Sequence, residues 1–393
     1  MWVKRAITPK IEATLVRGKS VLLFGPRQCG KTFLVKKLAH DLYITLMDPN
    51  LLRKYELNPG AFLQEVKAKK EALGRKPVVI IDEVQKIPDF TDGIQVLIDE
   101  QVAQFIITGS SARKINNLLP GRVIKFRLAP LSMLETDPQH LDLNKVLING
   151  SLPEIYINNS QDYINDLLNT YVNVYIEEEI RKEALVRNIM AFSNFFQLAC
   201  IESGNTVNLS KISADVGVSH HTIMEYYNIL RDCMLITSIQ PLTITDSRKR
   251  LTKSAKHLLC DLGVKRSGAD ESDRPNIQQL SLLFEQYIGL EISRMLEALN
   301  IQAKLFFWRS HDGPEVDYVI AFDNQYIPIE VKWTNNPSYK DIKHLITFSN
   351  EYRVDEFCYL VCRCETSRLI DDKVLAIPWQ ELPTIMMKLK EKI

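Results

Sequence analysis

A run of eight residues near the amino terminus could bind a phosphate group. Residues 25–32 read Gly-Pro-Arg-Gln-Cys-Gly-Lys-Thr and match the full pattern G-x-x-x-x-G-K-[ST]. Its glycines allow the backbone to curl so that successive N–H groups face one phosphate. Lys31 would then reach the β- and γ-phosphates of a nucleoside triphosphate, and Thr32 would be a ligand of Mg²⁺. The residues of this predicted nucleotide site are Gly25, Pro26, Arg27, Gln28, Cys29, Gly30, Lys31 and Thr32.

A pair of acidic residues further along the chain could hydrolyse the bound nucleotide. An apolar run over residues 77–81 ends in Asp82 and Glu83. Asp82 would hold Mg²⁺ through water, and Glu83 could polarise the attacking water as a general base. An acidic turn after an ordinary strand is the alternative, but the preceding phosphate-binding pattern favours the catalytic interpretation.

A sheet must bring these residues together. The predicted strands lie at residues 21–24, 43–47, 77–81, 105–109 and 123–128. Helical stretches separate them, and this alternation predicts a doubly wound, parallel α/β sheet. Ser110 and Ser111 follow the fourth strand, where they could contact the γ-phosphate or the attacking water, or instead cap the next helix. Arg122 lies just before the fifth strand. It could be a functional residue, or it could simply be a surface arginine.

The order of these features resembles an AAA+-type ATPase. The spellings Gly-Pro-Arg-Gln-Cys-Gly-Lys-Thr, Ile-Thr-Gly-Ser-Ser, Pro-Gly-Arg and Leu-Ala-Pro-Leu-Ser are similar to one bacterial and archaeal branch, whose members carry a characteristic C-terminal region. The resemblance implies ATP and Mg²⁺ as cofactors, with Ser110 or Ser111 as the sensor-1 residue. It also implies that Arg122 is an arginine finger acting across a subunit boundary of a homo-oligomer, of which a hexamer is one form.

Length and composition indicate several globular domains. A chain of 393 residues corresponds to about two to four domains. Its net charge of +1 gives no overall attraction to nucleic acid or to a membrane, so any such patch must be local. No apolar run reaches the ~18 residues of a membrane span, and the seven cysteines lack paired metal-ligand spacing. We therefore expect a reduced, cytoplasmic chain with no membrane partner.

The middle of the chain contains a predicted helix-turn-helix. Residues 209–216 and 220–230 have helical periodicity, with Gly217 in the turn and Ser219 as the second N-cap. A strand at 235–242 would supply a wing. The side chains that would enter a major groove are His220, His221, Thr222 and Glu225. Because they are poor phosphate binders, contact with DNA and contact with a protein both remain open.

A basic cluster strengthens the case for DNA. Its members are Arg248, Lys249, Arg250, Lys253 and Lys256. Such a density of cations could neutralise several phosphates and give salt-sensitive binding that is independent of sequence. A solvated loop is the alternative interpretation. We expect DNA as a partner, bound mainly through its phosphates.

The C-terminal third contains a second group of residues that could do chemistry. The predicted elements are a helix at 280–296, strands at 304–309, 314–322 and 325–332, a helix at 339–350 and a strand at 356–362. Because side chains alternate along a strand, Glu330 and Lys332 share one face, which Asp317 joins if its strand is in register. Carboxylates bind hard cations such as Mg²⁺ or Mn²⁺. Lys332 could orient or deprotonate a water that attacks a phosphodiester.

This element order, with Asp…Glu-x-Lys, resembles the PD-(D/E)XK nuclease superfamily. The resemblance implies that Asp317 and Glu330 are metal ligands, that Lys332 is the catalytic lysine and that Glu285 is the helix acid often found there. Glu-x-Lys also occurs at ordinary strand ends, and domains of this kind can bind nucleic acid without cutting it. Cleavage and simple binding therefore both remain open.

We expect three domains: an ATPase domain over residues 1–140, a helical region with a winged helix-turn-helix over 141–255, and an α/β nuclease-like domain over 256–393. Two functions are compatible with this organisation. One is an ATPase that acts on branched or broken DNA. The other is a nucleotide-dependent regulatory or defence switch that binds protein partners without cleavage.

Overall fold

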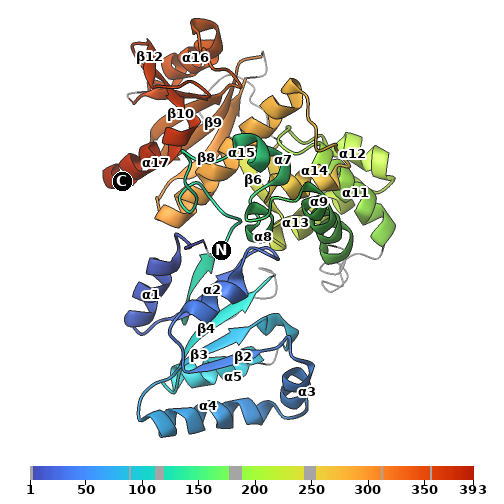
Figure 1. The fold of residues 1–393 in the computed structure, drawn as a ribbon, viewed down its shortest axis with the longest axis vertical. Coiled ribbons are helices and arrows are strands. Elements are labelled where there is room, and N and C mark those ends of the chain that lie inside the picture. Colours follow the sequence, from blue (N-terminus) through green and yellow to red (C-terminus); the bar gives the residue numbers. More distant parts are fainter. Residues whose placement is uncertain are drawn as a thin grey trace. The chain divides into compact units, whose positions relative to one another are not determined.

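The computed structural model describes residues 3–87, 90–110, 119–176, 188–242, 254–310, 313–354 and 356–393. The chain divides into two compact units, Met1–Leu131 with Asp232–Met234, and Ser132–Arg231 with Leu235–Ile393. Figure 1 shows the elements of each unit. Some predicted residues lie outside the described ranges, namely Ser111, Arg248, Lys249, Arg250 and Lys253.

The N-terminal unit is built on a parallel sheet. Among the described residues its strands are β1 Ser20–Phe24, β2 Leu42–Thr45, β3 Val78–Asp82, β4 Gln104–Gly109 and β5 Val123–Arg127. They are arranged in the order β2-β3-β4-β1-β5, and each neighbouring pair is parallel. The predicted parallel α/β sheet is therefore confirmed.

Helices cover both faces of this sheet (Figure 1). They are α1 Thr8–Val16, α2 Lys31–Lys37, α3 Pro49–Leu57, α4 Pro59–Leu73 and α5 Phe90–Asp99, with a 3₁₀ turn, η1, at Val84–Lys86. Consecutive strand residues point to opposite faces, so Ile80 joins the core under α1 and α2, whereas Ile81 joins the core under α4 and α5. Burial on both faces explains why these strands read as continuous apolar runs.

The second unit contains a mixed sheet. Its strands in the described chain are β6 Ile236–Pro241, β7 Lys256–Leu259, β8 Lys304–Arg309, β9 Glu315–Phe322, β10 Gln325–Val331, β11 Cys358–Cys362, β12 Arg368–Asp371 and β13 Val374–Pro378. The order is β12-β13-β11-β10-β9-β8-β6-β7. β9 and β10 are antiparallel, and β10 is parallel to β11. The predicted domain border at residue 256 falls at the first residue of β7, which pairs with β6.

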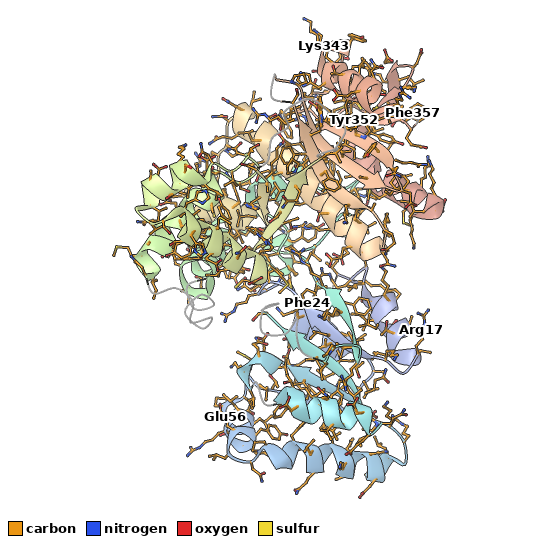
Figure 2. All side chains as sticks on the ribbon, turned by 180° about the vertical axis from the view of Figure 1, so that it is seen from behind. Arg17, Phe24, Glu56, Lys343, Tyr352 and Phe357 are labelled. Carbon is orange, nitrogen blue, oxygen red and sulfur yellow. The ribbon has the colours of Figure 1, made fainter. Side chains whose placement is uncertain are left out.

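The second unit also contains helices. They are α7 Leu143–Asn149, α8 Pro153–Tyr156, α9 Gln161–Thr170, α11 Ile189–Ile201, α12 Leu209–Val216, α13 His220–Asp232, α14 Leu262–Gly268, α15 Ile277–Leu299, α16 Lys343–Tyr352 and α17 Leu382–Lys392. Short 3₁₀ turns lie at Tyr339–Ile342 and Trp379–Glu381. On α16, whose end residues Lys343 and Tyr352 are labelled in Figure 2, the Tyr352 ring stacks on Phe348 with centroids 4.3 Å apart.

The helices and strands predicted for the helix-turn-helix segment are present. α12 ends at Gly217 in the left-handed region, and the Ser219 hydroxyl accepts a hydrogen bond from the Thr222 N–H at the start of α13. β6 lies within the predicted wing. α9 ends at Thr170, and a π-helical segment continues from there to Ile176.

Candidate functional site

The loop between β1 and α2 has the backbone that the phosphate-binding motif requires. It begins after Phe24, which Figure 2 labels at the end of β1. Gln28 and Gly30 adopt left-handed φ angles of 58° and 93°. A Cβ atom on Gly25 would lie 2.1 Å from the carbonyl oxygen of Leu128, so no other residue fits there. The loop is therefore held close against the segment that follows β5.

Lys31 folds back over this loop. Its ammonium donates hydrogen bonds to the carbonyl oxygens of Gly25, at 2.8 Å, and Pro26, at 2.9 Å. The side chain is buried. A lysine held over the loop by two carbonyls can exchange them for phosphate oxygens, which are stronger partners because they carry charge.

Arg5 also supports the loop, although no motif in the sequence indicates it. Its guanidinium donates to the carbonyl oxygens of Cys29 and Ala129, each at 2.6 Å. Arg5 is buried, and it thereby ties the loop to the segment after β5. An arginine before the first strand carries no local pattern that could have shown this role.

Asp82 is the centre of a hydrogen-bonded group at the end of β3. Its carboxylate accepts hydrogen bonds from hydroxyls on neighbouring elements: Thr32 of α2 at 2.9 Å, Tyr43 of β2 at 2.9 Å and Thr108 of β4 at 2.5 Å. Asp82 is only 2% exposed. Burial and the charge of Asp82 raise the pKa of Tyr43 to about 12, so the phenol remains a donor at neutral pH. The structure thus joins Thr32 and Asp82, as the motif predicts.

Glu83 follows in a strained backbone conformation. Its φ angle is 62°, in the left-handed region, and its N–H donates to the Thr108 hydroxyl at 3.1 Å. Gln85 Nε2 donates to the Glu83 carboxylate at 2.5 Å and to the Ser110 hydroxyl at 3.0 Å. Gln85 therefore links the side chains of Glu83 and Ser110. Thr108 carries a hydroxyl inside the apolar run of β4. This pattern in the sequence could have indicated that Thr108 belongs to the site.

Arg122 pairs with an aspartate of its own chain. Its guanidinium contacts both carboxylate oxygens of Asp99, at 2.7 and 2.8 Å, and the Pro120 carbonyl at 3.2 Å. These hydrogen bonds raise the pKa of Arg122 and lower the pKa of Asp99. Because Asp99 is the last residue of α5, the structure places Arg122 beside that helix end.

Asp317, Glu330 and Lys332 meet on neighbouring strands of the second unit. Asp317 Oδ2 accepts a hydrogen bond of 2.8 Å from the Val331 N–H, across the β9–β10 pair. Lys332 Nζ contacts Glu330 Oε1 at 2.6 Å. Within the described part of the chain, the buried Glu330 Oε2 has no hydrogen-bond partner. The predicted residues are therefore neighbours, and among the described residues one oxygen of the Glu330 carboxylate lacks a hydrogen-bond donor.

Burial and like charge perturb these acids. Burial raises the pKa of Asp317 and Glu330, and it raises the pKa of Glu285, on α15, to about 7. The Asp317 charge further raises the pKa of Glu330 and of Glu285. Burial alone would lower the pKa of Lys332, but the Glu330 and Asp317 carboxylates raise it overall. Asp317, Glu330, Glu285 and Lys332 are thus close enough for their charges to shift one another's pKa.

Lys256 does not belong to an exposed basic cluster, and the prediction that it contacts DNA phosphates is wrong. It is 4% exposed, and its ammonium lies 2.7 Å from Glu315 Oε1 and 3.4 Å from Glu285 Oε1. The reason is that β7 begins at Lys256 and pairs with Ile239 of β6, so the residue belongs to the sheet. A cavity of about 250 Å³ is lined by Lys256, Glu285, Glu315 and Asp317, among others.

Across the described ranges, no three His, Cys, Asp or Glu side chains are arranged to hold a metal ion. The predicted ligand set of Asp317, Glu330 and Glu285 therefore does not converge on one point in this conformation. The oxygen donors themselves are of the type that Mg²⁺ and Mn²⁺ prefer.

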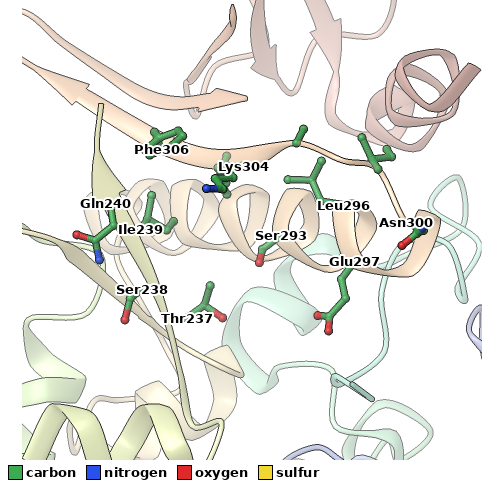
Figure 3. A pocket seen from close by; sticks show the side chains of 13 residues that line it. Thr237, Ser238, Ile239, Gln240, Ser293, Leu296, Glu297, Asn300, Lys304 and Phe306 are labelled. Carbon is green, nitrogen blue, oxygen red and sulfur yellow. The ribbon is translucent and has the colours of Figure 1, made fainter. Parts of the chain in front are cut away.

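A larger cavity, of about 480 Å³, lies between β6, β8 and α15 (Figure 3). Thr237 and Ser238 line it from β6, Ser293 and Glu297 from α15, and Lys304 from β8. It exists because β6 pairs with β8 only at Gln240 and Pro241, so the two strands diverge. None of the predicted site residues lines it.

Three protein families match successive parts of the chain. Residues 17–136 match a family described as an AAA domain. Residues 140–273 and 281–382 match two families described as domains of unknown function, DUF8612 and DUF4143. The parallel sheet, the phosphate-binding loop and the first of these matches define the N-terminal unit as a P-loop domain of the AAA type.

Relatives and similar structures extend over larger parts of the chain. The uncharacterized proteins Rv2008c of Mycobacterium tuberculosis and Mb2031c of Mycobacterium bovis are each 23% identical over 341 residues, covering 85% of this chain and 75% of theirs. A STAND protein with a tetratricopeptide repeat sensor from Pyrococcus horikoshii is 14% identical with a TM-score of 0.26, covering 76% of this chain. This chain spans about half, 47%, of that protein.

A further solved structure is a complex of Thermococcus gammatolerans McrB AAA+ hexamers with bound McrC. It is 11% identical with a TM-score of 0.24, covering 65% of this chain and 74% of that one. In the part of the chain that the structure describes, no helix has the length and hydropathy needed to cross a membrane.

Proposed function

We propose that the N-terminal unit binds ATP with Mg²⁺ and hydrolyses it. The observation that carries this proposal is the 2.9 Å hydrogen bond between the Thr32 hydroxyl and the Asp82 carboxylate, directly after the phosphate-binding loop. Both groups are oxygen ligands of the kind Mg²⁺ prefers, so Thr32 and Asp82 would hold the ion. Bound there, Mg²⁺ supplies positive charge to the phosphates.

The chain's own residues would perform the remaining steps. Lys31 would release the Gly25 and Pro26 carbonyls and bind phosphate oxygens. Glu83 would accept a proton from the attacking water, and Ser110, which lies within reach of the same carboxylate, would orient that water. Gln85 now holds the Glu83 carboxylate, so Glu83 must exchange this hydrogen bond for one to the water.

Equilibrium binding of ATP tests the nucleotide site. The full chain should bind ATP with Mg²⁺, and Lys31→Ala should lose that binding without unfolding, because its partners are two carbonyls that water can satisfy. Undiminished ATP affinity in Lys31→Ala would exclude the proposed site.

We further propose that Arg122 acts in trans in a homo-oligomer. In the free chain Asp99 holds its guanidinium through two parallel hydrogen bonds, a geometry that a γ-phosphate could replace. Sedimentation of the chain with and without ATP tests assembly, and a chain that stays monomeric at all nucleotide concentrations would contradict it.

We propose that ATP hydrolysis serves the processing of branched or broken DNA by a nuclease-like C-terminal domain. The support is the cluster of Asp317, Glu330 and Lys332, with the unpartnered Glu330 Oε2 as a position for a divalent ion. Forked, single-stranded and duplex DNA should be compared for stimulation of ATPase activity, and for cleavage with Mg²⁺ and with Mn²⁺.

A nucleotide-dependent switch that binds protein partners is the second candidate. The observation that favours it is the exposed start of α13, where His220, His221 and Glu225 stand without a lysine or arginine. Such a surface suits a protein better than a phosphate backbone. ATPase activity that no DNA stimulates, with no cleavage under either metal, would favour this alternative.

A further inference from the structure

We infer that the ammonium of Lys256 is the internal counter-charge of the C-terminal carboxylate cluster. We further infer that it keeps divalent metal ions from binding these carboxylates for as long as it lies among them. This inference rests on the proposed nuclease-like site, because it concerns how that site is regulated.

The ammonium is held from several elements at once. It contacts Glu315 Oε1, on β9, at 2.7 Å and Glu285 Oε1, on α15, at 3.4 Å. Its Nζ also lies 5.1 Å from the centre of the Phe307 ring on β8, within range of a cation–π interaction. Lys256 itself starts β7. A buried lysine fixed from these directions is part of the cluster and not a surface side chain that happens to fold inward.

Charge explains why the lysine is needed. Glu285, Glu315 and Asp317 line the same cavity, and a buried carboxylate without a counter-charge is strongly destabilising. Arg309 contributes only a longer contact to Glu315, at 3.6 Å, from a side chain that is 47% exposed. Lys256 therefore provides the buried positive charge of this part of the cluster. The same carboxylates raise its pKa despite the burial, so the ammonium stays charged.

A divalent ion would need the oxygens that Lys256 now occupies. Mg²⁺ and Mn²⁺ bind carboxylate oxygens at close range, and an ammonium within 2.7–3.4 Å of Glu315 and Glu285 both repels the ion and blocks its position. Removal of the lysine charge should turn the cluster into a cation site. In the native chain the site would accept metal only after the ammonium of Lys256 has left these carboxylates.

Binding of Mn²⁺ to the full chain tests this directly. Lys256→Met removes the charge, and Lys256→Gln removes the charge but keeps a donor for Glu285 and Glu315. Lys265→Met is the matched control, because Lys265 is a buried lysine of the same cavity whose partner is Glu271. Each of these proteins also carries Asp82→Asn and is measured without nucleotide. Any Mn²⁺ that binds is then bound to the second unit.

We expect both Lys256 variants to bind Mn²⁺ at least tenfold more tightly than the chain with Lys256, and Asp317→Asn to abolish the gain. Lys265→Met should show no gain. If the Lys256 variants unfold, Mn²⁺ should restore their circular dichroism; unfolding that Mn²⁺ does not reverse in either variant would overturn the inference.

Two further results would also overturn it: equal Mn²⁺ affinity with and without Lys256, and tight Mn²⁺ binding by the chain that retains Lys256. Failure of the proposed nuclease function is a different result, since DNA could remain uncut even though the Lys256 variants gain a metal ion.

Discussion

The hydroxyl of Tyr43 donates a hydrogen bond of 2.9 Å to Oδ2 of Asp82. The two residues lie on the neighbouring parallel strands β2 and β3, where Thr45 is the register partner of Asp82. Tyr43 therefore fixes the orientation of the carboxylate that, with Thr32, would hold Mg²⁺. We therefore expect Tyr43 to be a positioning residue, although no motif in the sequence indicates it.

Replacement of Tyr43 by phenylalanine tests this role. The ring and its packing remain, but Asp82 loses one donor, and hydrogen bonds to charged groups contribute about 1.5–3 kcal/mol. We expect about tenfold more Mg²⁺ to be needed for half-maximal phosphate release, with ATP binding in the absence of metal unchanged. Tyr326→Phe, in the second unit, is the control. Superimposable Mg²⁺ titrations of the Tyr43 variant and the native chain would refute the assignment.

The N-terminal site was predictable where its residues are neighbours in sequence. The phosphate-binding loop, Asp82 and Glu83 each occur in a contiguous pattern whose chemistry depends on local backbone geometry. Tyr43 and Arg5 could not be found in this way, whereas Thr108 could have been noticed as a hydroxyl inside an apolar run. Tyr43 and Thr108 reach the site because strands separated by tens of residues pair in parallel. Arg5 reaches it from the segment before α1, through hydrogen bonds to the carbonyls of Cys29 and Ala129. A single sequence gives neither the strand pairing nor these contacts.

In the second unit, the prediction made for Lys256 was wrong. Lys256 was grouped with the basic residues before it, because lysines and arginines at this density can neutralise several phosphates. The short strand β7 instead places it in a buried cluster, and only its pairing with β6 reveals this. Asp317, Glu330 and Lys332 were predicted to share a face because alternation along a strand is a local property, and β9 and β10 are indeed adjacent.

Arg122→Ala should leave ATP affinity nearly unchanged but depress turnover. An arginine finger contributes on the order of 10³-fold or more in rate, so the loss should be large if Arg122 completes a neighbour's site. Mixing this variant with Glu83→Gln protein should restore part of the activity. Some subunit boundaries then combine the intact Glu83 of one subunit with the intact Arg122 of its neighbour. Stable mixed oligomers without any recovery would argue against action in trans.

Asp317→Ala and Lys332→Ala should each abolish any DNA cleavage while ATPase activity persists, because the two sites lie in separate units. Gel assays with labelled DNA, run beside phosphate-release assays on the same protein preparations, measure both. Cleavage that survives in both variants would remove these residues from the proposed nuclease site.

His257 should make the second unit less stable in acid. Burial, and then the charge of Arg231, lower the pKa of His257 from 6.5 to about 4. Between these values the unfolded chain binds a proton that the native chain does not, so stability is full above pH 6.5 and falls as the pH drops toward 4. The loss would amount to about 2–3 kcal/mol.

His257→Phe keeps a ring against Tyr227, whose centroid lies 4.4 Å from that of the histidine, and should remove this part of the pH dependence. Urea unfolding at pH 4.5 and pH 7 provides the comparison. An equal acid-induced loss in the variant and the native chain would show that other groups are responsible.

The comparison of Glu83→Gln with Lys31→Ala tests the central claim most directly. In the proposed mechanism Glu83 would accept the proton from the attacking water and would not contact the phosphates. Glu83→Gln should therefore bind ATP with nearly native affinity yet release phosphate at least a hundredfold more slowly, a loss typical of a missing general base. Lys31→Ala should lose binding itself. Equal loss of ATP affinity in the two variants, or undiminished phosphate release by Glu83→Gln, would contradict the account.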